Sequence, residues 1–138
     1  MDCKDKLNER QTEELREFFS KDGFARNAGC HIDSVGCDWS ICSIDINDMH
    51  RNAFGMIMGG VMVTLADFAA AVISNRPGKY TTANSLNTTF VGNSKSNRIK
   101  AYARLRRDGR STNYTEVEIC DDEGKQLAFI TVLGFHLN

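Results

Sequence analysis

Residues 50–71 read HRNAFGMIMGGVMVTLADFAAA, a polar loop followed by a glycine pair and a long apolar segment. Gly59 and Gly60 stand where a helix is expected to begin. The free N–H groups of a helix start, with the positive end of its dipole, attract developing negative charge. One acid, Asp67, lies within the apolar segment, where a buried carboxylate is costly unless it is paired or functional. Together with the Asn52 amide in the loop, these groups indicate chemistry at a carbonyl.

The apolar segment predicts a central helix from about Gly59 to Asn75, which Pro77-Gly78 ends. An earlier amphipathic helix is predicted from Lys6 to Lys21, with Asp22-Gly23 as its end. Alternating residues predict strands. Two lie between 28 and 47 and turn near Val35-Gly36, and four more lie at 81–91, 98–106, 112–120 and 126–135, with a hairpin at Asp108-Gly109. This pattern predicts an α+β fold in which an antiparallel sheet curls around the helix.

Length and composition predict one domain over residues 1–138, with residues 1–23 as an N-terminal helical extension. The chain is 41% hydrophobic and 25% charged, and its net charge of −1 predicts no general attraction to nucleic acid or anionic membranes. A membrane-spanning helix over residues 56–73 is disfavoured, because a central Asp costs roughly 2.5–3.5 kcal/mol on insertion scales.

The chain has five cysteines, without a C-x-x-C pair or a metal-ligand spacing: Cys3, Cys30, Cys37, Cys42 and Cys120. We interpret them as reduced thiols in a cytoplasmic, metal-free protein. The first ten residues also lack the apolar region of a secretion signal.

If Asp67 and Gly59 serve one site, the acid comes from a second subunit. Asp67 lies eight residues beyond Gly59, which is about 12 Å along a helix axis at a rise of about 1.5 Å per residue. The carboxylate therefore cannot easily reach a carbonyl held at its own helix start. A dimer with antiparallel central helices would form two equivalent sites.

The same residues resemble the family motif H-x-N-x-x-G-x-x-H-G-G-x-x-x-x-L-A-D, which Asn52, Gly55, Gly59-Gly60 and Leu65-Ala66-Asp67 match in order. The motif is that of hotdog-fold acyl-CoA thioesterases of the phenylacetic-acid-degradation (PaaI-like) type. The similarity extends from about residue 24 to residue 136 and includes the turn Asp108-Gly109-Arg110. The resemblance implies a hotdog fold, homodimers or homotetramers, and hydrolysis of a thioester to a free acid and coenzyme A. Coenzyme A enters as part of the substrate, and no separate cofactor is implied.

The resemblance also implies catalytic roles. The backbone N–H of Gly59 would polarise the thioester carbonyl, and the Asn52 side chain would position the carbonyl or the attacking water. Asp67 of the partner chain would act as general base on that water, or as a nucleophile. Its apolar surroundings should raise its pKa towards neutrality.

Two positions depart from the family pattern. Met58 replaces the usual histidine before the glycine pair, and a thioether cannot donate a hydrogen bond. Ala83 falls where a serine or threonine often holds the water, and Thr81, Thr82 or Ser85 are the substitutes that the sequence offers. These two departures leave open whether the activity is weak or the substrate is unusual.

Coenzyme A carries phosphates, and residues 95–110 hold seven basic residues and one acidic residue, a net charge of +6. Arginine suits phosphate through its planar set of donors. The resemblance places the turn at 107–112 near the coenzyme. Taken alone, the histidine at 136 is expected to be a surface residue. The substrate-binding residues implied in this way are Met58, Gly60, Ala83, Phe90, Arg107, Gly109, Arg110, Ser111 and His136.

Other functions stay open on the sequence. The main alternative is a non-catalytic hotdog module that binds an acyl thioester, with Met58 and Ala83 as signs of lost chemistry. A hotdog hydratase needs an Asp–His pair, and the predicted central helix contains no histidine. In a purely structural assembly protein, Asp67 would serve only a contact between subunits. The acyl group, aryl-acetyl or medium-chain, is not fixed.

Overall fold

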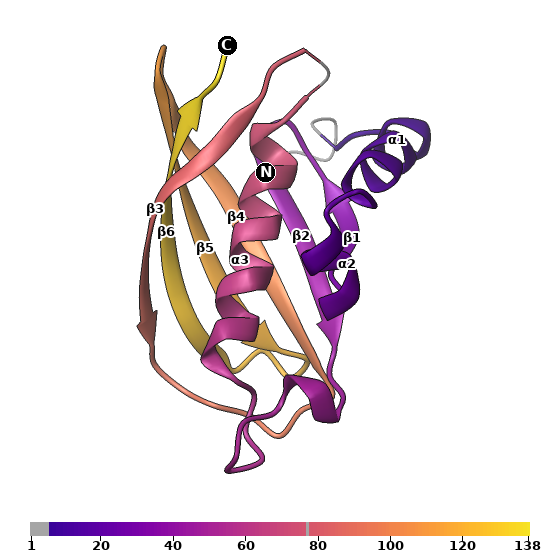
Figure 1. Ribbon diagram of the computed structural model, residues 1–138, viewed down its shortest axis with the longest axis vertical. Coiled ribbons are helices and arrows are strands. Elements are labelled where there is room, and N and C mark those ends of the chain that lie inside the picture. The colour runs from indigo at the N-terminus through magenta and orange to yellow at the C-terminus, as the bar shows by residue number, and fades with distance from the viewer. Residues whose placement is uncertain (1–5, 77) are drawn as a thin grey trace.

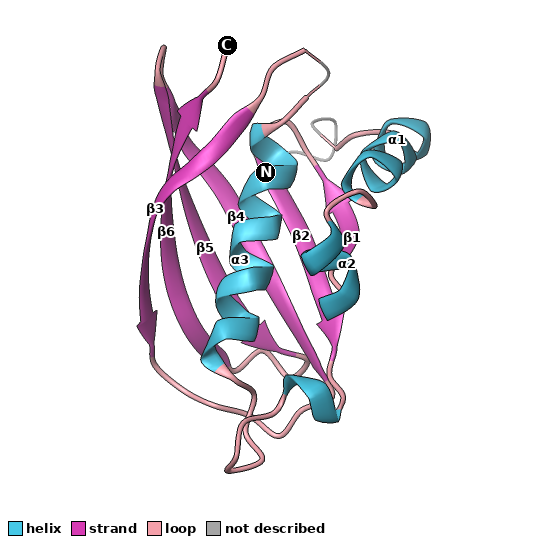
Figure 2. Ribbon diagram, viewed as in Figure 1, coloured by secondary structure: helices cyan, strands magenta, loops and turns pink. Residues whose placement is uncertain are grey.

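The central helix α3 (Gly59–Ser74) lies against the concave face of a six-stranded antiparallel sheet in the computed structural model (Figure 1). The two helices of the N-terminal region lie on the same side of this sheet as α3 (Figure 2). The structure describes residues 6–76 and 78–138, so Cys3 and Pro77 lie outside the described residues. The strands are β1 (His31–Val35), β2 (Trp39–Asp45), β3 (Thr81–Phe90), β4 (Arg98–Asp108), β5 (Thr112–Asp121) and β6 (Gln126–His136).

The strands are ordered β1-β2-β4-β5-β6-β3, and every neighbouring pair is antiparallel. The predicted curled sheet and central helix are therefore confirmed. The strand predicted at 126–135 is apolar on both faces and lies in the interior of the sheet as β6, between β5 and β3. The hairpin at Asp108-Gly109 joins β4 to β5 as predicted, and the Gly109 N–H donates to Thr112 O at 2.8 Å.

The core forms between α3 and the inward side chains of the sheet. Leu65 and Ala69 of α3 are fully buried, as are Ile99 and Ala101, which alternate with exposed or half-buried polar residues along β4. Burying a side chain the size of leucine contributes about 1.5–3 kcal/mol. The apolar face of α3 therefore fixes which side of the sheet becomes the inside.

The N-terminal region contains two helices where the sequence predicts one. The first, α1 (Glu9–Phe19), begins later than Lys6 because Asn8 caps it through reciprocal bonds with Gln11, of 2.9 and 3.0 Å. The first helix ends at Phe19, before Asp22-Gly23, and the second helix, α2 (Gly23–Ala28), which was not predicted, follows directly. The left-handed residue that ends the helices is Gly29, with φ 88°.

Strand β3 forms one edge of the sheet. It pairs with β6, and the row of backbone groups on its other side has no strand partner among the described residues. Its sequence, TTANSLNTTF, carries no charge, and its side chains are exposed or half-buried. The register shifts between Ala83 and Ser85. This edge has none of the charged residues that usually protect an open strand.

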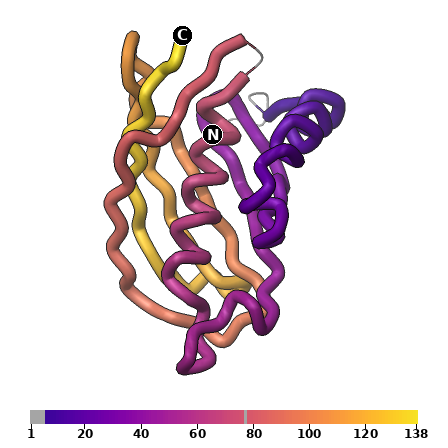
Figure 3. The backbone as a smooth tube through the Cα atoms, viewed as in Figure 1, coloured from indigo at the N-terminus to yellow at the C-terminus, as the bar shows by residue number. Residues whose placement is uncertain are grey.

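The two ends of α3 meet different connections. The segment between β3 and β4 passes beneath the N-terminal end of the helix (Figure 3), where the Asn93 side chain bonds both the N–H and the carbonyl of Ile57. The hairpin between β4 and β5 lies at the C-terminal end, where Asn113 donates to Ser74 Oγ at 3.1 Å.

No helix in the described ranges is long and apolar enough to span a membrane.

Candidate active site

The N-terminal end of α3 offers two unengaged backbone donors. The helix begins after Met58, whose backbone is extended and whose side chain makes no capping bond. Among the described residues, no hydrogen bond is donated by the N–H of Gly59 or Gly60, as expected for a first helical turn. The aromatic ring of Phe90 packs against Gly59, because a Cβ there would lie 2.8 Å from Phe90 Cζ. Glycine thus lets the ring and the helix start meet closely.

The preceding loop is shaped by Asn52. Its Oδ1 accepts from the N–H groups of Phe54 at 2.9 Å and Met56 at 3.1 Å, which makes it a turn-forming residue. The side chain is exposed, and its Nδ2 donates no hydrogen bond within the described ranges. The amide nitrogen therefore remains an available donor in the loop that precedes α3.

The loop is anchored to α2 by His50. This imidazole is 2% exposed, accepts the Asn47 N–H at Nδ1, and bonds Ala28 O from Nε2 at 2.6 Å. The histidine that matches the family motif is thus engaged on both nitrogens. It acts as a structural residue of the loop.

Asp67 is exposed in the single chain, so the expectation of a buried acid was wrong. The residue lies on the outer face of α3, because the apolar face of the helix turns to the sheet. It borders a pocket of about 250 Å³ together with α2 and Leu86 of β3. Partial burial there raises the pKa of Asp67, and the charge of Asp22 raises it further. The predicted direction of the shift is confirmed.

The pocket includes residues that the sequence analysis missed. Asp22 and Phe24 line it beside Asp67, and Phe24 is 75% exposed. Asp22 occupies the N-cap position of α2 but makes no side-chain capping bond. The sequence signal was the Asp-Gly pair itself, which starts a second helix and brings α2 next to α3.

One chain does not bring Asp67 and Gly59 together. Both belong to α3, a continuous helix, so the eight-residue interval keeps them about 12 Å apart along the axis. Ala83, the expected water-positioning site, is exposed on β3. Of its possible substitutes, Thr81 is engaged with His136 and Ser74, and Thr82 and Ser85 are exposed.

The β4–β5 hairpin lies far from the chain's own Gly59. Arg107, Arg110 and Ser111 are exposed and Gly109 is half-buried, and the hairpin that carries them lies at the C-terminal end of α3 (Figure 1). The helix has 16 residues, so its ends are about 24 Å apart. Residues expected to share one coenzyme site therefore occupy opposite ends of the single chain, with Met58, Gly60 and Phe90 at the other end.

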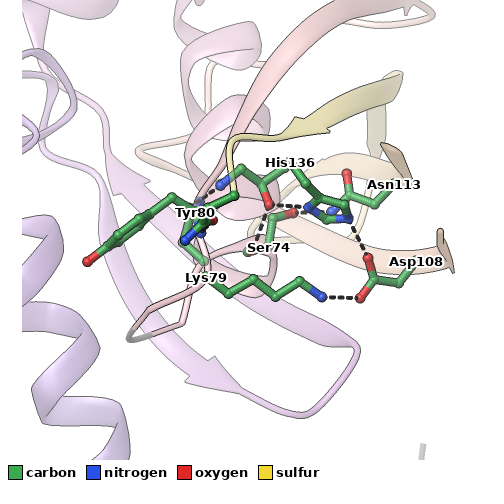
Figure 4. Close-up of polar contacts among 9 residues, drawn as sticks. Ser74, Lys79, Tyr80, Asp108, Asn113 and His136 are labelled. Atoms are coloured by element: carbon green, nitrogen blue, oxygen red, sulfur yellow. Dashed lines mark hydrogen bonds and ion pairs between the residues drawn. The ribbon is translucent and has the colours of Figure 1, made fainter. Parts of the chain in front are cut away.

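His136 is buried, so the expectation of a surface histidine was wrong. Its side chain is 3% exposed and lies between Thr81 and Asp108, at 2.8 and 2.9 Å (Figure 4). The hydrogen bonds from Lys79 and His136 outweigh partial burial and lower the pKa of Asp108. No local sequence pattern indicates this pair, because 28 residues separate its members.

Burial raises the pKa of three of the described cysteine thiols. Cys42 and Cys120 are buried strand residues, and burial raises the pKa of both thiols, that of Cys120 to about 11. Burial raises the pKa of Cys30 to about 12. Such thiols stay protonated near neutral pH and are poor nucleophiles.

Within residues 6–76 and 78–138, no three His, Cys, Asp or Glu side chains converge as a metal site requires.

Comparison with known families shows the family of the chain. A model of the thioesterase superfamily matches residues 54–128, more than half of the chain. The chain belongs to the thioesterase superfamily. This thioesterase-family chain is 26% identical over 108 residues to 1,4-dihydroxy-2-naphthoyl-CoA hydrolase of Listeria monocytogenes serotype 1/2a (strain 10403S). That match covers 76% of the chain and 88% of the relative.

Solved thioesterase-family structures share the fold. The E. coli PaaI protein superposes with a TM-score of 0.82 at 19% identity, over 93% of this chain and 96% of PaaI. A thioesterase of Streptococcus pneumoniae TIGR4, solved with coenzyme A, gives 0.80 at 18% identity, over 88% and 96%. The hotdog fold and the PaaI-like resemblance are confirmed, and the family assigns the chain to the thioester hydrolases.

Proposed function

We propose that the protein is a homodimeric acyl-CoA thioesterase in which each active site combines groups from both subunits. The observation that carries the proposal is the placement of Gly59 and Asp67 on one helix, about 12 Å apart along its axis. The free N–H groups suit an oxyanion, and the acid with a raised pKa suits proton abstraction. One site can use both only if the acid comes from another chain.

The open edge of β3 supports a dimer that brings these groups together. Pairing of two β3 edges about a two-fold axis would continue the sheet and set the two α3 helices antiparallel on one face. The outer face of α3 carries Gly60, Thr64, Asp67 and Ala71, at helical spacing and exposed or half-buried. Small residues there let a second helix approach. The partner's Asp67 lies level with Gly59 when the two-fold axis passes near Val63, midway between these residues along the helix.

In the proposed reaction, the Gly59 N–H polarises the thioester carbonyl and the Asn52 amide positions the carbonyl or the water. Asp67 of the partner takes a proton as the water oxygen attacks the carbonyl carbon, and the oxyanion forms at the helix start. The C–S bond then breaks, the free acid forms, and the proton passes to the departing thiolate. In the alternative route Asp67 attacks the carbonyl itself and the C–S bond breaks, which releases the coenzyme A thiolate; water then hydrolyses the resulting anhydride to the free acid and the Asp67 carboxylate.

Coenzyme A would extend from Gly59 towards the partner's β4–β5 hairpin in this dimer. The exposed Phe90 beside Gly59 would contact the pantetheine, and Arg107 and Arg110 would meet the phosphates. The coenzyme A in the streptococcal structure and the naphthoyl-CoA activity of the Listeria relative support a CoA thioester as substrate.

The first test is hydrolysis of acetyl-, hexanoyl-, lauroyl-, phenylacetyl- and benzoyl-CoA. Free coenzyme A is measured by chromatography, because an exposed thiol such as that of Cys37 would also react with a thiol dye. We expect turnover of at least one member. Binding of acyl-CoA without turnover would favour the non-catalytic module, which Met58 and Ala83 suggest, and Met58→His would then be the change to examine.

The shared site has its own test, in which Asp67→Asn and Asn52→Ala subunits are mixed and allowed to exchange. A mixed dimer holds one site with Asn52 from the first chain and Asp67 from the second, so activity should recover in the mixture. Each variant alone supplies the control. If mixing restores nothing although subunits exchange, Asp67 and Asn52 belong to the same chain's site.

A further inference from the structure

A network of polar side chains surrounds His136 at the C-terminal end of α3 (Figure 4). Its Nε2 lies 2.9 Å from Asp108 Oδ1 and donates the hydrogen, since a carboxylate only accepts. Its Nδ1 lies 2.8 Å from Thr81 Oγ1. The other carboxylate oxygen of Asp108 accepts from Lys79 Nζ at 3.1 Å. With 3% of its side chain exposed, His136 is closed to ligands and serves its protein neighbours.

The histidine holds both arms of the β4–β5 hairpin. Its side chain bonds Asp108, the last residue of β4, while its backbone N–H donates to Ser111 O on the other arm at 2.9 Å. Thr81 continues the chain of bonds by donating to Ser74 O at 3.1 Å. The hairpin is thereby linked to the last residue of the central helix.

A second contact fixes the hairpin at the same place. Asn113, 3% exposed, donates from Nδ2 to Ser74 Oγ at 3.1 Å. Gly134 of β6 makes room for this amide, because a Cβ at that position would collide with Asn113 Oδ1. Two independent side-chain contacts thus hold an otherwise exposed turn against α3.

The hairpin held in this way presents two arginines without acidic partners. Arg107 and Arg110 are exposed, and neither forms an ion pair with any residue in the ranges 6–76 and 78–138. Arg106, by contrast, pairs with Glu116 at 2.9 Å. A rigid turn with two unpaired guanidinium groups suits a phosphate, because Arg–phosphate bonds need a fixed donor geometry.

We propose that His136 is a positioning residue for coenzyme A, which holds Asp108 and so fixes the hairpin where Arg107 and Arg110 bind phosphates of the nucleotide. The inference rests on the proposed function, because it takes an acyl-CoA as the ligand. His136 touches no substrate atom. It acts on the affinity for the nucleotide half of the substrate and leaves the reacting thioester end unchanged.

The test compares two substitutions of His136, each of which places an amide near only one of the two imidazole nitrogens. His136→Gln places an amide N–H near the former Nε2 and keeps the donor to Asp108, whereas His136→Asn reaches only the Nδ1 side. We expect His136→Asn to raise KM for a hexanoyl-CoA substrate about tenfold, the size expected for a lost charge-assisted contact. Its kcat should not change, and His136→Gln should stay near the unmodified protein.

Hexanoyl-pantetheine, which lacks the nucleotide and its phosphates, is the matched substrate. Its KM and kcat should be the same in both variants. In Arg107→Gln/Arg110→Gln, KM for hexanoyl-CoA should already be high, and adding His136→Asn should change it little. Arg10→Gln on α1 is the control for loss of an exposed arginine. An equal loss on both substrates, or an unchanged KM for hexanoyl-CoA, would overturn the proposal.

Two further measurements test the role of His136 in cases where the first variant does not fold or the unmodified protein shows no turnover. If His136→Asn does not fold, Lys79→Met removes the exposed contact to the same carboxylate and should raise KM in the same direction, by less. If the unmodified protein hydrolyses no acyl-CoA, the proposed function fails by itself. Calorimetric binding of coenzyme A against pantetheine then tests the hairpin: weaker coenzyme A binding in His136→Asn supports the inference, and equal binding overturns it.

Discussion

At the N-terminal end of α3, the loop before Gly59 is exposed, and the Asn52 amide supports it by accepting backbone N–H groups. At the C-terminal end, His136 and Asn113 are buried and bond other side chains. The first end keeps backbone donors unengaged, and the second uses its polar groups to fix a turn. The comparison indicates that one end is suited to chemistry and the other to holding a ligand in place.

The largest expected effect belongs to Asp67, midway between the two ends. Asp67→Asn keeps the shape and polarity of the side chain but removes the base, so kcat/KM should fall by a factor of about 10² or more. Steady-state hydrolysis of the best acyl-CoA measures the change, with circular dichroism as the check on folding. Activity within a factor of about two of the unmodified protein would contradict the role of this acid.

A smaller effect is expected at the helix start. Gly59→Ala adds a Cβ 2.8 Å from Phe90 Cζ and so displaces the ring or the N–H that would meet the oxyanion. We expect kcat to fall about tenfold, less than complete loss of an oxyanion donor, which costs about 10²-fold or more. Phe90→Leu should relieve the crowding, so the double variant should recover part of the lost rate. If Phe90→Leu alone lowers kcat as much, the ring itself is needed.

The prediction that the central helix starts at Gly59 succeeded because it depends on local pattern. The same holds for the strand alternation along β4 and the hairpin at Asp108-Gly109, each of which needs only a few neighbouring residues. The exposure of Asp67 and the burial of His136 were missed because they depend on which face of α3 meets the sheet and on pairing between distant strands. The helix α2 was missed because an Asp-Gly pair such as Asp22-Gly23 is typical both of the end of one helix and of the beginning of another.

The pH dependence of kcat tests the environment of Asp67. The base must be ionised, and partial burial raises its pKa, with the charge of Asp22 adding to the effect. Activity should therefore be lost as pH falls through this raised pKa. Asp22→Asn removes the neighbouring charge, so the acidic limb should move to lower pH while the plateau rate stays nearly constant. An unmoved limb would show that Asp22 does not act on the base.

The smallest expected effect concerns the stability of the C-terminal end. The hydrogen bonds from Lys79 and His136 outweigh partial burial and lower the pKa of Asp108. Its ionised form therefore stabilises the fold above the ordinary carboxyl pKa, and this contribution is lost as pH falls through the lowered value. Because the carboxylate is 39% exposed, Asp108→Asn should cost at most about 1 kcal/mol at pH 7.

Urea unfolding at pH 7 and in strong acid measures this difference. The gap between the unmodified protein and Asp108→Asn should close in acid, because both side chains are then neutral. Glu123→Gln, in the exposed turn between β5 and β6, is the matched control. A gap that persists in acid would assign the loss to packing rather than to charge.

The open edge of β3 has a consequence for the chain outside any assembly. Ten residues with no charge and no proline offer unpaired backbone groups to any extended segment that they meet. A second β3 would occupy this edge in an ordered way, and an unfolded or misregistered strand would occupy it in a disordered way. Apparent stability and solubility should therefore depend on protein concentration in opposite senses, with dimer formation acting as protection against aggregation.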